Sequence, residues 1–152
     1  MYLRTIGCRF TQMIAYFLVI NSKRCINFFF FIFCSFNKLR TDIALKVSFQ
    51  GIMRVAGTGQ RCSRWYNKLN GRECNSPMPI EAVLFNYWPS SVGNPNLLHH
   101  RSFEGYCENI ARGAVRVELW IGKCKGFTLG DAATGWTYSS RIIIEEVSRP
   151  QS

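Results

Sequence analysis

Apolar and polar residues alternate along two stretches of the chain, residues 42–50 and 114–121. Successive side chains of a β-strand point to opposite faces, so a two-residue period places the apolar residues on one face. We therefore predict two half-buried strands. The residues predicted to face inward are Ile43, Leu45, Val47, Phe49, Val115, Val117, Leu119 and Ile121. Those predicted to face outward are Ala44, Lys46, Ser48, Gln50, Arg116, Glu118 and Trp120.

A β-hairpin is predicted for residues 65–74. Asn70-Gly71 lies between two strand-like runs. A type I′ turn needs a positive φ at both central residues, a conformation that Asn and Gly tolerate well. Trp65 and Tyr66 lie inside this hairpin, and we expect them to belong to the core.

The rest of the pattern consists of short strands separated by turn-rich loops. Residues 80–85 form a near-continuous apolar run, which predicts a central strand buried on both faces. Further strands are expected at residues 97–103 and 141–147. Short strands with glycine-rich turns predict an all-β fold, an antiparallel β-sandwich or barrel. We also expect loops at residues 57–59, 89–95 and 130–139, a turn or bulge at Gly51, and a helical turn near residues 108–112.

The first 36 residues differ in composition from the remainder, because they hold eight of the twelve phenylalanines and no acidic residue. Two apolar runs, residues 13–20 and 26–33, flank Lys23 and Arg24, and each is shorter than the ~20 residues that span a bilayer. Three interpretations stay open: a degenerate signal peptide, a membrane-associated stretch, or a mis-predicted gene start. The predicted organisation is this segment, a β-sandwich domain at residues 37–148 and a tail at residues 149–152.

Seven cysteines are many for a chain of 152 residues. Four of them lie in the predicted sandwich, and an even set with wide spacing suits two disulfides, for which three connectivities exist. The alternative is that they are buried and reduced. No C-x-x-C pair is present, which argues against zinc-knuckle and thioredoxin-like sites. The disulfide candidates are Cys62, Cys74, Cys107 and Cys124.

The formal net charge of +10 raises the question of a polyanionic partner. The basic residues are scattered among acidic ones, so we expect no nucleic-acid binding. Weak binding to heparan sulfate is an alternative to a merely solvated basic surface. The residues that would contact heparan sulfate are Arg61, Arg64, Lys68, Arg72, Lys123 and Lys125.

No arrangement of residues points to catalysis. His99 and His100 are consecutive, and consecutive strand positions face opposite ways, so the pair is not expected to hold one metal ion. Asp131 is expected to cap backbone N–H groups in a turn. We therefore predict no enzyme activity, no cofactor and no metal site.

Several short motifs are spread over residues 36–147: R-W-Y, N-G-x-E-C, P-x-P-I-E-A, E-G-Y-C-E, V-x-V-x-L-W-I-G-x-C, G-D-A-x-T-G-W and S-R-I-I-I-E-E. Together they resemble the C-terminal domain of the collagen triple helix repeat-containing protein family. The collagen repeat itself is absent. Cys34 matches a family cysteine and could be the odd one, free or used between chains.

The resemblance implies a secreted protein of the extracellular matrix that acts by protein binding. It implies roles in cell migration, matrix remodelling and Wnt signalling, with a Frizzled-type receptor or collagenous matrix as partner. It also implies a jelly roll of the tumour-necrosis-factor and complement-head type that forms a homotrimer.

Aromatic and arginine side chains are the candidates for contacting a partner, because they dominate the binding energy of protein interfaces. Trp88 and Trp136 are expected in loops, and Trp120 is expected on an outer strand face, where it would form a subunit contact or cap the second sheet. Arg61 and Arg64 complete the candidates. The alternative function is a lectin-like, carbohydrate-binding sandwich that uses Trp136 and Asp131.

Overall fold

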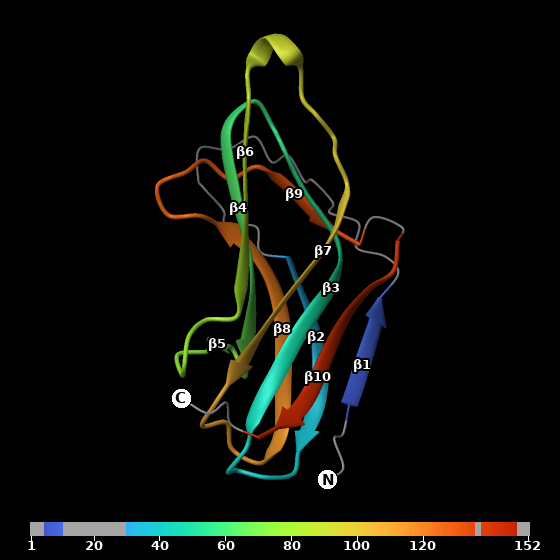
Figure 1. Ribbon diagram of the computed structural model, residues 1–152, viewed down its shortest axis with the longest axis vertical. Coiled ribbons are helices and arrows are strands. Elements are labelled where there is room, and N and C mark those ends of the chain that lie inside the picture. The colour runs from blue at the N-terminus through green and yellow to red at the C-terminus, as the bar shows by residue number, and fades with distance from the viewer. Residues whose placement is uncertain (1–4, 11–29, 136–137, 149–152) are drawn as a thin grey trace, which may run out of the picture.

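The computed structural model describes residues 5–10, 30–135 and 138–148 (Figure 1). The described part is all-β, as predicted, and its only helical element is the short 3₁₀ turn η1 (Ser90–Val92). The strands are β1 (Thr5–Phe10), β2 (Phe30–Lys38), β3 (Ala44–Ala56), β4 (Gly59–Leu69), β5 (Arg72–Glu73), β6 (Glu81–Trp88), β7 (His99–Cys107), β8 (Gly113–Lys123), β9 (Asp131–Thr134) and β10 (Ser140–Val147).

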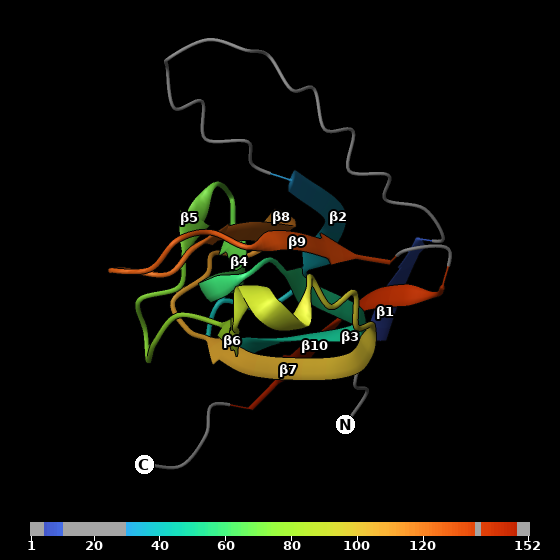
Figure 2. The ribbon, with the colours of Figure 1, turned by 90° about the horizontal axis from the view of Figure 1, so that it is seen from above.

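The strands form two antiparallel sheets. The first sheet has the order β1-β10-β3-β7, and β9 pairs with the far end of β3. The second has the order β2-β8-β4-β5, and β6 pairs with β4 beside β5. Seen from above, the sheets lie in two layers (Figure 2), so the described fold is a β-sandwich.

The core lies between the sheets and is built from the predicted alternation. Leu45, Val47 and Phe49 of β3 are fully buried, and so are Val117 and Leu119 of β8. These side chains meet across the sandwich in one apolar cluster. The expectation that Trp65 and Tyr66 are buried is also confirmed.

The predicted hairpin is confirmed as β4–β5. Asn70 and Gly71 have φ of 51° and 80°, the positive values that the turn requires. The turn is tied to β8, since the Asn70 N–H donates to the Arg116 carbonyl at 2.8 Å and the Arg116 N–H donates to Asn70 Oδ1 at 2.8 Å. This pair of hydrogen bonds fixes the turn of the hairpin to β8, a strand of the same sheet.

Two disulfides stabilise the sandwich. Cys62–Cys124 joins β4 to the residue that follows β8, and both strands belong to the second sheet. Cys74–Cys107 joins the residue that follows β5 to the last residue of β7 and so connects the two sheets. Cys34 is also disulfide-bonded, so it is not the odd cysteine, free or used between chains, that had been expected.

The strongest correction concerns residues 80–85. The prediction of a central strand buried on both faces is wrong, because β6 is an edge strand that pairs with β4 alone. Exposed and half-buried residues alternate along it. A continuous apolar run had been taken to mean burial on both faces, but an edge strand can expose the same residues.

Gly51 is neither a turn nor a bulge, since β3 passes through it in regular register with β7. A Cβ at this position would collide with the Ser140 side chain and would lie 3.0 Å from the Phe49 ring. The glycine therefore allows the close approach of β10 to β3.

Three smaller expectations also differ from the structure. The loop predicted at residues 130–139 contains the strand β9, which pairs with the end of β3. No helical turn forms at residues 108–112, where Asn109 instead has a φ of 58°. Asp131 does not cap a turn, because its carboxylate lies 2.6 Å from the Arg54 guanidinium.

Two strands lie in the N-terminal segment, where none was expected. β1 pairs with β10 and β2 pairs with β8, so each adds to one of the sheets. β2 crosses the expected boundary at residue 36, and the division into domains stays a prediction. Residues 11–29, with most of the two apolar runs, lie outside the described residues. No helix among the described residues is long and apolar enough to cross a membrane.

Candidate interaction surface

The outer side of β6 exposes a row of apolar side chains. Val83, Phe85 and Tyr87 are 53%, 51% and 61% exposed, and they share one face of the strand because they are spaced by two. Phe127 packs edge-on against Phe85 with ring centroids 5.3 Å apart. We call Val83, Phe85, Tyr87 and Phe127 the β6 outer row. Contiguous exposed apolar groups of this kind mark interaction sites more often than isolated ones do.

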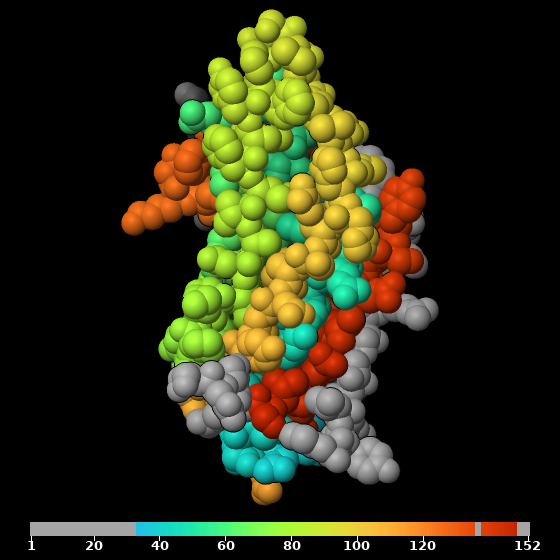
Figure 3. All heavy atoms as spheres, in the orientation of Figure 1, coloured from blue at the N-terminus to red at the C-terminus, as the bar shows by residue number. Residues whose placement is uncertain are grey.

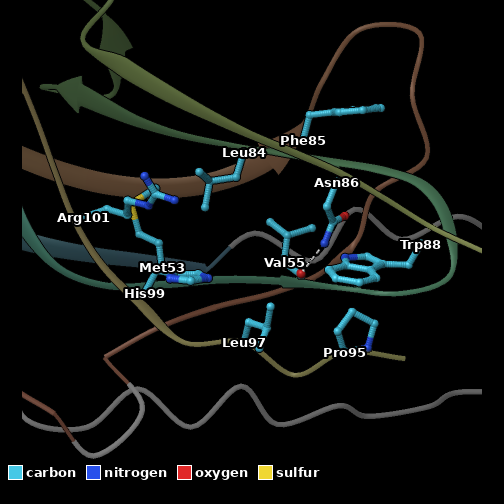
Figure 4. A pocket seen from close by; sticks show the side chains of 10 residues that line it. All are labelled: Met53, Val55, Leu84, Phe85, Asn86, Trp88, Pro95, Leu97, His99 and Arg101. Atoms are coloured by element: carbon cyan, nitrogen blue, oxygen red, sulfur yellow. Dashed lines mark hydrogen bonds between the residues drawn. The ribbon is translucent and has the colours of Figure 1, made fainter. Parts of the chain in front are cut away.

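The inner side of β6 borders a groove with a cavity of about 170 Å³. Leu84, Asn86 and Trp88 line it from β6, and Met53 and Val55 of β3 line it from the first sheet (Figure 4). The amide of Asn86 donates to the Val55 carbonyl at 2.7 Å, which fixes its orientation. Trp88 was expected in a loop, but it is the last residue of β6.

The opposite wall of the groove comes from β7 and the segment before it. Phe103 packs on Phe49 at 5.5 Å in the core, and residues two apart along a strand face the same way. Arg101 and His99 therefore face the groove, and both lie among its lining residues. Residues of β6 and β7 lie side by side on one face of the molecule (Figure 3).

Arg64, a candidate for partner binding, is held in a network within the chain. Its guanidinium bonds to the carboxylates of Glu73, on β5, and Glu81, on β6. It also stacks 4.2 Å from the centroid of the Tyr66 ring. The hydrogen bond to Glu73 raises the pKa of Arg64, and burial raises the pKa of Tyr66. Arg64 therefore joins three neighbouring strands, and its availability to a partner stays a prediction.

Trp120 is half-buried rather than exposed. Its indole Nε1 donates to Glu118 Oε2 at 2.7 Å, and the Lys68 ammonium lies 4.1 Å from the centroid of its ring system. Trp120 lies opposite Phe31 of β2 and Tyr66 of β4 in the strand register. These contacts fit the interpretation that Trp120 caps the second sheet. Its role in a contact between subunits stays a prediction.

The remaining candidates do not gather in one place. Arg61 donates its Nε–H to the Thr58 carbonyl at 2.7 Å and lies near the start of β4. Trp136 lies outside the described residues, so the sugar site expected from Trp136 and Asp131 has no described geometry. His99 and His100 are both exposed on β7. No group of three metal-ligating residues occurs within the described ranges.

The sequence interpretation missed the β6 outer row. Val83 and Phe85 had been assigned to the core because the run at residues 80–85 is apolar, although they alternate with Leu84 and Asn86 along β6. The two proline residues just before the strand, Pro77 and Pro79, were a usable signal, since prolines favour edge strands.

A comparison with known protein families gives one match. The family described as "CTHRC1, C-terminal domain" matches residues 15–144, which is most of the chain. The two disulfides fit a protein that resides in an oxidising, extracellular environment. Family and disulfides together indicate an extracellular, matrix-related protein. The chain therefore belongs to the CTHRC1 C-terminal domain family.

Proposed function

We propose that the chain is an extracellular interaction module that binds a protein partner through the β6 outer row. The partner would be a Frizzled-type receptor or collagenous matrix, with a role in Wnt and planar-polarity signalling, matrix remodelling and cell migration. Membership of the family supports the extracellular setting. No step of chemistry is part of the proposal.

One observation carries it: an edge strand of a disulfide-linked sandwich exposes three large apolar residues in a row. Exposing them costs solvation free energy, about 25 cal/mol for each Å² of apolar surface left in water. A partner that covers the row recovers this free energy. Aromatic residues such as Phe85 and Tyr87 are also the type that dominates binding at interface centres.

The test is a matched pair of substitutions. Tyr87→Ser removes the most exposed member of the row, and Tyr138→Ser makes the same change at a residue that is 58% exposed but belongs to the segment before β10. Binding to immobilised collagen and to a Frizzled ectodomain is measured by surface plasmon resonance. We expect Tyr87→Ser to weaken binding about tenfold or more, which is typical of an interface hot spot. Equal binding of the two variants would contradict the proposal.

Homotrimer formation is a separate proposal that rests on the family resemblance, and it competes for the same surface. Sedimentation velocity on both tyrosine variants separates the two. If Tyr87→Ser dissociates an oligomer that Tyr138→Ser leaves intact, the β6 outer row is a contact between copies, and its assignment to a receptor is wrong.

A further inference from the structure

The groove behind β6 has features that the β6 outer row lacks. Among the described residues, β6 forms a ladder only with β4, and β7 forms one only with β3. Apart from a single bridge between Pro77 and Cys107 at the end of β7, each strand therefore has one edge without a ladder partner in the part that the structure describes. These two edges border the same groove. Unpaired strand edges offer backbone N–H and C=O groups to an added extended segment.

The size of the cavity restricts what can enter it. Its volume is about 170 Å³. Sites for drug-sized ligands have roughly 300–1,000 Å³, whereas a cavity of about 150 Å³ holds a single benzene ring. The groove therefore fits one large apolar side chain, such as that of leucine or phenylalanine, better than a whole small-molecule ligand.

The residues that line the groove indicate the chemistry of a ligand that would fit it. Leu84, Trp88 and Leu97 provide apolar walls, and the Asn86 Oδ1 atom is buried without a hydrogen-bond partner among the described residues. At the rim, Arg101 is exposed and takes part in no ion pair found in the described part of the chain.

From these features we propose that the groove between β6 and β7 binds an extended, acidic peptide segment of a partner protein. One leucine-sized side chain of the peptide fills the cavity, and a neighbouring carboxylate pairs with Arg101. The site differs from the β6 outer row, because Leu84 and Asn86 point into the groove whereas Phe85, which also borders it, points away (Figure 4). Tyr87 is not among the residues that line the groove. This site does not depend on the proposed receptor or matrix binding.

Fluorescein-labelled peptides test the proposal on the full chain. The probe is Gly-Asp-Leu-Asp-Glu-Gly, and its controls are Gly-Asn-Leu-Asn-Gln-Gly, which lacks the charge, and Gly-Asp-Ser-Asp-Glu-Gly, which lacks the apolar anchor. Fluorescence anisotropy should show saturable binding of the probe below about 1 mM, the weak range expected of a single anchor. Each control should bind about tenfold more weakly, since it loses the charge pair or the buried side chain.

Two variants of the protein locate the site. Arg101→Glu reverses the charge at the rim, and Arg141→Glu makes the same change at an exposed position of β10. We expect Arg101→Glu to weaken probe binding about tenfold and Arg141→Glu to change it by less than about twofold, the screened effect of a distant charge.

Three results would overturn the proposal: no binding of the probe up to that concentration, equal binding of all three peptides, or equal effects of the two arginine variants. Tyr87→Ser separates this proposal from the proposed function. It should leave peptide binding unchanged even where it abolishes binding to collagen or the receptor.

Discussion

Strands β8 and β6 have similar apolar content but opposite surroundings. β8 lies between β2 and β4, and its Val115, Val117 and Leu119 are buried against the first sheet. Among the described residues, β6 pairs on one side only, with β4, and its Val83 and Phe85 are exposed to solvent. The difference lies in the neighbours that each strand pairs with rather than in its composition. An apolar strand in this fold is therefore either core or a surface available for binding, and its place in the sheet decides which.

The largest expected effects come from the two disulfides, Cys74–Cys107 and Cys62–Cys124. Replacing Cys74 and Cys107 together by serine removes the link between the sheets, which closes a loop of 33 residues. In the chain-entropy model this lowers the free energy of unfolding by about 4 kcal/mol. Urea denaturation measures the loss, and amide hydrogen exchange should rise more in β6 and β7 than in β8.

The companion double variant is Cys62→Ser with Cys124→Ser, which removes the disulfide that spans 62 residues and joins β4 to the end of β8 in the second sheet. Its loss should be at least as large, also about 4 kcal/mol. A stability unaffected by either double variant would contradict the role of the disulfides in holding the sandwich together.

The second prediction compares the two strands directly. Leu119→Ala in β8 leaves a cavity in the core and should cost about 3 kcal/mol. Val83→Ala in β6 removes methyl groups from a half-exposed side chain and should cost less than about 0.5 kcal/mol. Equal losses in urea denaturation would mean that β6 is as buried as β8.

The third prediction concerns Gly51 in the central strand β3. Gly51→Ala places a methyl group against the Ser140 side chain, and such overpacking typically costs about 1–3 kcal/mol. The double variant Gly51→Ala with Ser140→Gly opens the space again and should recover most of the loss. If thermal denaturation shows no rescue, the close approach of β10 does not explain the glycine.

The smallest expected effect is a dependence of the free energy of unfolding on pH, which arises from Glu104 of β7. The hydrogen bond from Lys46 lowers the pKa of Glu104 below its usual value of 4.5. A carboxyl whose pKa is lowered by folding adds stability above that value, and the addition is lost as the pH falls through the lowered pKa. Because Glu104 is largely exposed, we expect less than about 1 kcal/mol. Glu104→Gln should flatten the stability profile below pH 4.5, whereas wild-type and variant curves of the same shape would contradict the assignment.

The sequence predicted the parts of the fold that depend on local pattern. The burial of the inward-facing residues of β3 and β8, the Asn70-Gly71 hairpin and the all-β class are confirmed. Ala44, Ser48 and Glu118 were predicted to face outward, but they are buried as well. The predictions failed where pairing between distant segments decides the outcome. Nothing near Phe85 in the sequence states that β6 lacks a second neighbour, and nothing near Gly51 reveals Ser140 beside it.

The candidate site was predicted less well than the fold. Trp88 was named for its residue type, and the structure places it in the groove with Leu84 and Arg101. Phe85 was assigned to the core with the run at residues 80–85, because a run of apolar residues does not show whether its second face is covered. Arg64 was named for its charge, but its acidic partners come from β5 and β6, which only the folded chain brings together.

Amide hydrogen exchange tests the central claim most directly, with the chain measured alone and in complex with a Frizzled ectodomain or collagen. We expect the amides of β6 to exchange faster than those of β8 in the free chain and to become protected in the complex, with little change in β8. Protection in the complex that leaves β6 unchanged, or slow exchange of β6 in the free chain, would contradict the account.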